Sequence, residues 1–331
     1  MISRRSFSKS ALATGALLAV APKFAGAQAT PEADAFPVTI EHALGSTTIE
    51  SQPLRVVTVG WSADDALVAL GTVPVQSPLQ SYGGDENGLL PWLTAAIGDR
   101  PLPATRDDSA ALNIEEIVAA EPDLIFAPYS GISQEEYDQL SAFAPTIAYP
   151  EIAWTNSWQG VTRTAGQALG IPAAAEQLIA DTEAYVAEQA AAYPAIAGKS
   201  FLFGTVFDGF SVYIEEDARS QFLMSLGMVP SDFVKSLEPD SDTSFYVSIS
   251  LESANELVAD IVLMWFGSQE EYEAAVTESH LDLIPGFDEG RFVPVVGQDL
   301  VMATSAWSTL SIGYALDAFL PLLDAAAQNV G

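Results

Sequence analysis

Two stretches of the chain share one pattern of apolar and polar positions. They run over Asn113–Tyr137 and Leu251–Tyr272. In each, a short amphipathic segment leads to an acidic turn, an apolar run, an aromatic residue and the pentapeptide Ser-Gln-Glu-Glu-Tyr. A glutamate precedes an aspartate by eight residues in both copies, as Glu115 and Asp123 and as Glu252 and Asp260. The pattern predicts a short helix, a buried strand and a Ser-capped helix twice, and therefore two half-molecules of similar design.

Apolar runs elsewhere predict the remaining strands and helices. Ser62 is expected to cap a helix over Ala63–Leu70, and an almost wholly apolar helix over Leu310–Ala327 should pack on the second half. Buried strands are predicted at Arg55–Gly60, Val73–Val75, Leu124–Phe126, Thr146–Tyr149, Ser200–Phe207, Val212–Ile214 and Phe292–Val296.

One long helix is predicted between the two halves. Pro172 suits its first turn, and apolar positions follow a helical period from Ala173 to about Ala192. About twenty residues give a rod of roughly 30 Å, enough to join both halves and limit hinge motion. The predicted fold is α/β, with Rossmann-like lobes over residues 30–155 and 197–331, a helical region over 156–196 and a ligand cleft between the lobes.

The first 29 residues have the features of an export signal. Paired arginines, Arg4 and Arg5, precede an apolar run and small-residue cleavage sites, which favours a twin-arginine signal over an ordinary Sec signal. No later stretch has eighteen uninterrupted apolar residues. The chain contains no cysteine, so the expectation is a free periplasmic or secreted protein that is not a lipoprotein.

Charge and composition exclude several classes of function. Beyond the signal, eight basic residues remain beside 44 acidic ones, a formal charge of −36, which argues against nucleic-acid or anionic-membrane partners. The acidity fits either solubility in a saline habitat or a preference for neutral or cationic ligands. Two histidines, His42 and His280, are too few for a bare-metal site, and surface positions are expected for both. No Gly-x-Ser-x-Gly elbow or cysteine nucleophile indicates an enzyme.

A set of short segments in a fixed order carries a resemblance to a known family. The segments are Arg55–Gly60, Ala66–Val75, Asn113–Glu115, Pro122–Phe126, Ala168–Gly170, Ala197–Lys199 and Gln221–Gly227. Over nearly all of its length beyond the signal, the chain resembles the iron–siderophore and cobalamin substrate-binding proteins of ABC importers, the class with two lobes on one long helix. The resemblance implies a monomer without cofactor that carries a ferric siderophore to a dimeric permease.

Glu115 and Glu252 match the family's pair of permease-docking glutamates, one on each lobe. Two carboxylates presented by a rigid body suit a dimeric partner, because charge complementarity fixes the register of docking. The alternative is that each is a first-turn acid favoured by the helix dipole, and Glu116 is the nearest other choice.

The candidate ligand residues lie beyond strand ends or in loops facing the expected cleft. Aromatic walls would contact the apolar skin of a ferric chelate, and a few Arg or Tyr donors would reach its oxygens. The resemblance matches Tyr129 to a binding tyrosine and Arg106 to a binding arginine of hydroxamate-siderophore members. Because few basic residues are present, a ferrioxamine- or ferrichrome-type hydroxamate is favoured over a catecholate, with haem or cobalamin as the alternative. The candidates are Trp61, Tyr82, Arg106, Tyr129, Trp154, Phe207, Tyr213, Arg219, Trp265 and Trp307.

Overall fold

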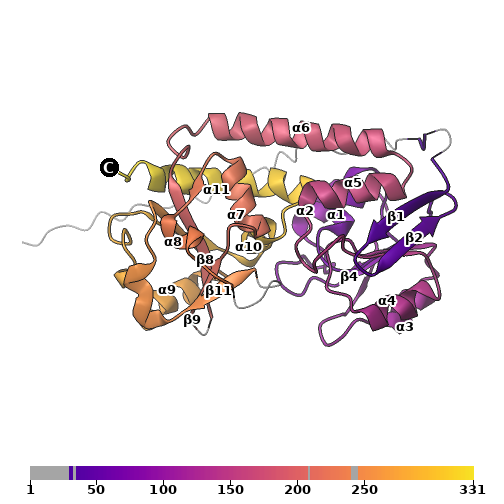
Figure 1. Ribbon diagram of the computed structural model, residues 1–331, viewed down its shortest axis with the longest axis horizontal. Helices are drawn as coiled ribbons and strands as arrows, with labels where there is room; N and C mark the ends of the chain where they lie inside the picture. Colours follow the sequence, from indigo (N-terminus) through magenta and orange to yellow (C-terminus); the bar gives the residue numbers. More distant parts are fainter. Residues whose placement is uncertain (1–29, 33–34, 208, 240–244) are drawn as a thin grey trace, which may run out of the picture.

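Two α/β lobes lie side by side beneath one long helix in the computed structural model (Figure 1). The structure describes residues 30–32, 35–207, 209–239 and 245–331. The predicted export signal over residues 1–29 lies outside this described part. The predicted α/β class with two lobes and a long helix is confirmed.

The first lobe is built on a parallel sheet in the order β5-β4-β3-β6-β7. The chain leaves β3 outward through β4 and β5 and then returns to β6 on the other side of β3, so the carboxyl ends of β3 and β6 meet at a topological switch point. The strands are β3 (Val56–Thr58), β4 (Gln76–Pro78), β5 (Ala104–Arg106), β6 (Leu124–Phe126) and β7 (Thr146–Ile147), with an antiparallel hairpin of β1 (Val38–His42) and β2 (Gly45–Ile49) beside them. The helices are α1 (Ala63–Ala69), α2 (Pro91–Ile97), α3 (Ile114–Ala119), α4 (Gln134–Ser141) and α5 (Trp158–Ala168).

The second lobe carries a mixed sheet in the order β11-β9-β8-β12-β13, with β10 also paired to β8. Strands β9 and β11 are antiparallel, so this lobe is less Rossmann-like than expected. The strands are β8 (Ser200–Phe207), β9 (Gly209–Tyr213), β10 (Val229–Pro230), β11 (Tyr246–Ile249), β12 (Ile261–Phe266) and β13 (Phe292–Val296). The helices are α7 (Ala218–Ser225), α8 (Asp232–Lys235), α9 (Gln269–Glu278) and α10 (Gln298–Ser305), with 3₁₀ turns η1 (Leu251–Glu256) and η2 (Leu281–Leu283).

The repeated aspartates perform the same task in both lobes. Asp123, before β6, accepts hydrogen bonds from the backbone N–H groups of Leu54 and Arg55, at 2.7 and 2.8 Å, just ahead of β3. Asp260, before β12, accepts one at 2.8 Å from Ser200 at the start of β8. Each aspartate therefore joins the amino ends of two neighbouring parallel strands. This shared arrangement in the two lobes confirms the predicted duplication of design.

Two expectations about the ends of elements are wrong. Ser62 precedes α1, but its side chain makes no cap and instead donates to the carbonyl of Ala306 in the other lobe at 3.0 Å. Trp265 lies inside β12 rather than beyond its end. The predicted strand at Val73–Val75 is displaced to β4, and the short helix of the second repeat is the 3₁₀ turn η1.

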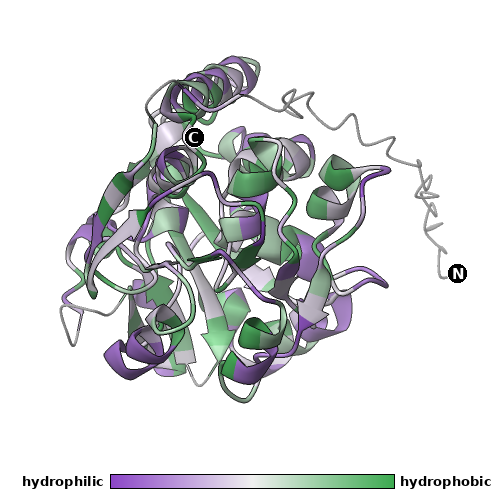
Figure 2. Cartoon of the chain, turned by 90° about the vertical axis from the view of Figure 1, so that its right-hand side faces the viewer, coloured by the Kyte–Doolittle hydropathy of each residue, from purple (hydrophilic) through white to green (hydrophobic). Residues whose placement is uncertain are grey.

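Two helices connect the lobes. Helix α6 (Pro172–Ala191) has 20 residues and buries Leu178, Ile179 and Val186, as predicted. Helix α11 (Thr309–Ala327) packs on β12 and β13 of the second lobe, as predicted, and also on α1 and α2 of the first lobe. Within the described residues, α11 is also long and apolar enough to cross a membrane by length and composition, with 61% of it buried. Hydrophobic residues concentrate on the strands and inner helix faces (Figure 2).

Candidate functional site

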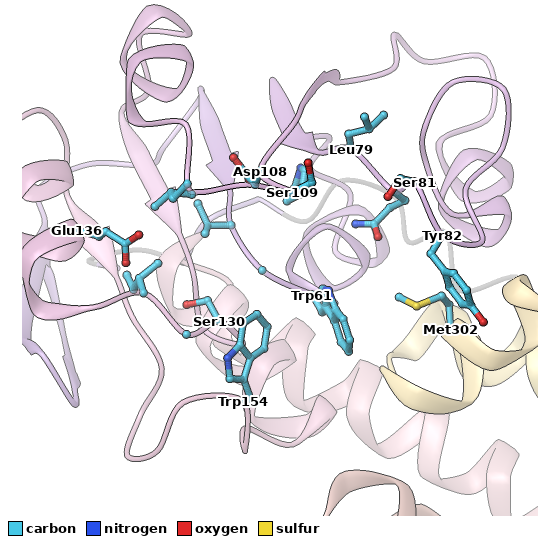
Figure 3. A pocket seen from close by; sticks show the side chains of 17 residues that line it. Trp61, Leu79, Ser81, Tyr82, Asp108, Ser109, Ser130, Glu136, Trp154 and Met302 are labelled. Atoms are coloured by element: carbon cyan, nitrogen blue, oxygen red, sulfur yellow. The ribbon is translucent and has the colours of Figure 1, made fainter. Parts of the chain in front are cut away.

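A cavity of 380 Å³ opens at the carboxyl ends of β3, β4, β5 and β6 (Figure 3). Parallel strands place the residues that follow them along one edge of the sheet, which is why these four loops and the loop after β7 meet here. The second lobe contributes one lining residue, Met302 of α10. The lining residues are Val59, Gly60, Trp61, Pro78, Leu79, Gln80, Ser81, Tyr82, Asp108, Ser109, Leu112, Ser130, Gly131, Ile132, Glu136, Trp154 and Met302.

Two tryptophans form the aromatic wall of this cavity. Trp61 follows β3 and Trp154 follows β7; each is 38% exposed, and their ring centroids lie 5.7 Å apart. Gly60, with φ of +87°, lets the first loop approach Tyr129, whose carbonyl accepts a 3.0 Å hydrogen bond from the Trp61 N–H. The indole of Trp154 covers Gly131, where a Cβ would lie 2.3 Å from the indole nitrogen. Both rings are therefore positioned by glycine backbone beneath them.

Tyr129 lies between the cavity and the second lobe. Its ring packs edge-on to Trp154 at 6.0 Å, and it is 7% exposed. Burial raises the pKa of the Tyr129 hydroxyl to about 12, with Arg219 lowering it and Asp217 raising it. These two charges belong to the second lobe, so Tyr129 faces them across the cleft. The hydroxyl is a neutral hydrogen-bond donor at ordinary pH.

A second cavity of 560 Å³ continues between the lobes on the other side of Tyr129. Trp307 lines it and stacks on Phe222 of α7, with centroids 3.5 Å apart. Trp307 is 4% exposed, so it acts largely as packing between the lobes. The lining residues are Tyr129, Thr155, Asn156, Ser157, Trp158, Gln159, Glu216, Ala218, Gln221, Phe222, Met224, Ser225 and Trp307.

Four candidates of the second lobe form one connected group. The Trp265 indole N–H donates to the Tyr213 hydroxyl at 2.7 Å, and the Arg219 guanidinium lies 3.7 Å from the Tyr213 ring centroid. Arg219 also makes a two-fold ion pair with Asp217, with both N···O distances 2.7 Å. Phe207, which is 79% exposed, packs edge-on to Trp265 at 6.3 Å. These four residues line neither described cavity.

Arg106 does not reach the cavity, which corrects its assignment as a ligand residue. It is fully buried, and its guanidinium donates to Gln76, to the Thr58 carbonyl and twice to Asp108, at 2.8 and 2.6 Å. The residue that lines the cavity is Asp108, which Arg106 holds in place. Four of its five N–H donors are used in these bonds, and the fully buried side chain is not among the residues that line the cavity.

Tyr82 connects the first lobe to the second. The N–H of the next residue, Gly83, donates to the Gln298 side chain of α10 at 3.3 Å. The Tyr82 hydroxyl lies beside Gly267, where a Cβ would be 2.8 Å from it. Burial, and then the nearby Glu271 carboxylate, raises the pKa of Tyr82. This loop therefore closes one end of the cleft.

Two buried carboxyl groups lie on α1 beneath the site. Burial raises the pKa of Asp64 to about 7, although the nearby hydroxyls of Thr58 and Ser77 lower it. Burial raises the pKa of Asp65 to about 6; it accepts a hydrogen bond from Trp92 at 2.7 Å and another from Ser308 at the start of α11. Asp65 therefore bonds across the boundary between the lobes.

Sequence reasoning missed several lining residues, including Asp108, Ser130, Glu136 and Met302. Their one available signal was position after a predicted strand or at a helix start. The expectation of a surface position for His42 is wrong, because it is 8% exposed and its Nε2 bonds to Thr47 at 3.0 Å. Among the residues that the structure describes, no group of three His, Cys, Asp or Glu side chains could hold a metal ion.

Known proteins resemble the chain over most of its length. The "Probable siderophore-binding lipoprotein YfiY" of Bacillus subtilis is 27% identical over 228 residues, 68% of this chain and 67% of that protein. The ferric enterobactin-binding periplasmic protein FepB of Escherichia coli is 28% identical over 222 residues, 64% and 67% of the two chains. PiaA of Streptococcus pneumoniae, in a crystal structure with ferrichrome, is 32% identical, with a TM-score of 0.80 over 89% of this chain and 100% of that one.

The lipoprotein name of YfiY overturns the expectation of a free protein that is not a lipoprotein. That expectation rested on the absence of cysteine alone.

The sequence pattern of the periplasmic binding protein family matches residues 56–279. This match confirms the predicted resemblance, and with it the expectations of a binding protein that is not an enzyme and of no resident cofactor. Because the match covers more than half of the sequence and the PiaA structure is covered in full, the chain belongs to the periplasmic binding protein family.

Proposed function

We propose that this protein captures a ferric siderophore of the hydroxamate type and delivers it to an ABC importer permease. The observation that carries the proposal is an aromatic-walled cavity between two lobes, in a chain 32% identical to a protein crystallised with ferrichrome. Trp61 and Trp154 offer flat apolar faces to a bulky chelate. The Tyr129 hydroxyl is a donor for a chelate oxygen.

The charges around the cleft favour a hydroxamate over a catecholate. Both guanidinium groups near the site, on Arg106 and Arg219, are already paired with Asp108 and Asp217. A strongly anionic catecholate chelate would need unpaired cations, whereas a neutral hydroxamate chelate needs only apolar contact and a few donors. The similarity to the ferric enterobactin-binding FepB makes the catecholate the alternative to test.

Tryptophan fluorescence of the protein tests this assignment. We expect strong, saturable quenching by ferrichrome or ferrioxamine B, and weak or no quenching by a ferric catecholate, ferric citrate, haem or cobalamin. Trp154→Phe should reduce the quenching, because Trp154 lies in the cavity wall with 38% exposure. Saturation by haem or cobalamin alone would overturn the siderophore assignment, and saturation by the catecholate alone would overturn its hydroxamate part.

We also propose that Glu115 and Glu252 dock the protein on its permease. Both are exposed in the first turn of a helix, Glu115 on α3 and Glu252 on η1. Glu116 is less suited, because its carboxylate accepts a 3.0 Å hydrogen bond from Asn113 as part of the cap. The exposed carboxylate beside it is therefore the better partner for a permease arginine.

Uptake measurements test the docking pair. Replacing both glutamates by alanine should abolish uptake of the chelate and leave its affinity in solution unchanged. Glu135→Ala with Glu270→Ala is a matched control, since these exposed residues occupy equivalent positions in the two Ser-Gln-Glu-Glu-Tyr segments. Equal loss of uptake in both double variants, or a loss of affinity in the first, would contradict docking through Glu115 and Glu252.

A further inference from the structure

All charged side chains that line the two described cavities are carboxylates. Asp108 and Glu136 line the first cavity, and Glu216 lines the second. Glu271 approaches the first cavity from the opposite lobe, beside the Tyr82 hydroxyl. Acidic groups from both lobes therefore lie in or near the two cavities.

Of these carboxylates, Asp108 is offset by Arg106, whereas the basic side chains of the described residues make no ion pair with Glu136, Glu216 or Glu271. Arg106 and Arg219 pair with aspartates, as described above. Lys199 precedes β8, at the edge of the sheet away from the cleft. The others bond elsewhere: Arg55 and Arg100 to backbone carbonyls, Arg163 to Glu176, Lys235 to Asp232 and Arg291 to Glu289.

Glu136 presents its carboxylate to the cavity from the first turn of α4. One oxygen, Oε2, accepts hydrogen bonds from the N–H and hydroxyl of Ser133, at 2.7 and 2.8 Å. The carboxylate points toward the recess that Ser130 and Trp154 also border (Figure 3). A cavity lined by both a carboxylate and exposed tryptophan faces is a suitable setting for a protonated amine, which both groups attract.

We propose that the cavity prefers ferric chelates that carry a protonated amine on a pendant arm, with the ammonium group beside Glu136 and against the tryptophan wall. This inference rests on the proposed function, because it concerns the same cavity and its cargo. Glu136 would thus be a specificity-determining residue in addition to a capping residue. The repeated Ser-Gln-Glu-Glu-Tyr segment then contributes to recognition as well as to helix capping.

A matched pair of ligands tests the preference. Ferrioxamine B carries a free ammonium group, whereas its N-acetylated form has the same iron centre and no positive charge. We expect the protein to bind ferrioxamine B about fivefold more tightly at low salt, the upper range for a partly exposed ion pair. The preference should weaken as salt is added.

Glu136→Gln is the informative variant, because glutamine can still cap α4. It should bind the two chelates equally, with a melting temperature close to that of the original protein. Glu135→Gln, which removes the same charge from an exposed neighbour on the same helix, should keep the fivefold preference.

Equal affinity for the two chelates in the original protein would overturn the inference and leave the siderophore function standing. A preference that persists in Glu136→Gln would also overturn it. Binding of neither ferrioxamine form would overturn it as well, and if ferrichrome also failed, the proposed function would fail with it.

Discussion

Replacing Asp64 by asparagine should remove a pH dependence of stability that burial creates. Asp64 is 8% exposed on α1, and burial raises its pKa from 3.8 to about 7, against the lowering effect of hydrogen bonds from Thr58 and Ser77. The folded state therefore holds this proton more tightly than the unfolded state does. The resulting stabilisation is present below about pH 4 and is lost as pH rises through 7.

The change of unfolding free energy with pH can be calculated from the shift in the pKa of Asp64. One pKa unit corresponds to 1.36 kcal/mol, so a shift of about three units is worth about 4 kcal/mol between pH 4 and pH 8. Asparagine has nearly the same shape and no charge to bury. Between pH 4 and pH 8, the unfolding free energy of the variant should therefore fall by about 4 kcal/mol less than that of the original protein.

Urea unfolding at pH 4 and pH 8 measures this difference, because groups remote from Asp64 titrate alike in both proteins. Asp282→Asn, which changes an exposed carboxylate, is the control and should behave like the original protein. Equal changes of unfolding free energy with pH in the original protein and Asp64→Asn would refute the reasoning.

Three further substitutions have defined outcomes. Arg106→Ala should lower the unfolding free energy measured in urea by about 3–5 kcal/mol, because it leaves the Asp108 carboxylate without its partner. Unchanged stability with weakened chelate binding would contradict the structural role of Arg106. Gly60→Ala should lower the melting temperature more than Gly198→Ala. Both glycines have positive φ, but a Cβ at Gly60 would lie 2.3 Å from a backbone carbonyl oxygen, whereas a Cβ at Gly198 would meet nothing within 4 Å. Equal losses of melting temperature would exclude the clash at Gly60. Ser308→Ala should lower the unfolding free energy by about 1–2 kcal/mol, and by more at pH 8 than at pH 5, because Asp65 loses a hydrogen bond that its ionised form needs. Thermal unfolding measures this loss of stability, and a loss that does not depend on pH would refute the link to Asp65.

The apolar pattern located most strands, because a buried parallel strand is apolar on both faces. It failed at β4, where Gln76 and Ser77 are buried although both are polar. Their partners explain the burial: Gln76 accepts from Arg106 at 2.9 Å, and Ser77 bonds to Thr58 at 3.4 Å. A polar layer inside a lobe is recognisable only when the partners on other strands are known. Arg106 was assigned to the ligand site for the same reason, because its buried polar partners lie on other strands.

The aromatic residues of the site were easier to predict than its acids. Trp61 directly follows an apolar run, so its place at a strand end could be read from the sequence. Glu136 has the pattern of a capping residue, and it does cap α4. Nothing local indicates that it also borders a cavity, because that depends on how α4 is packed. Met302 likewise reaches the cavity only through the contact between the lobes.

The double connection of the lobes through α6 and α11 affects how a transporter could distinguish full from empty carriers. Because both helices pack against the lobes along their lengths, the overall shape of the molecule and its radius of gyration should change little when the ligand binds. Small-angle scattering can measure this change. A permease would then obtain little information from overall shape. Under the proposed function, the surface that differs is the mouth of the cavity, where an iron chelate would replace water against Trp61 and Trp154.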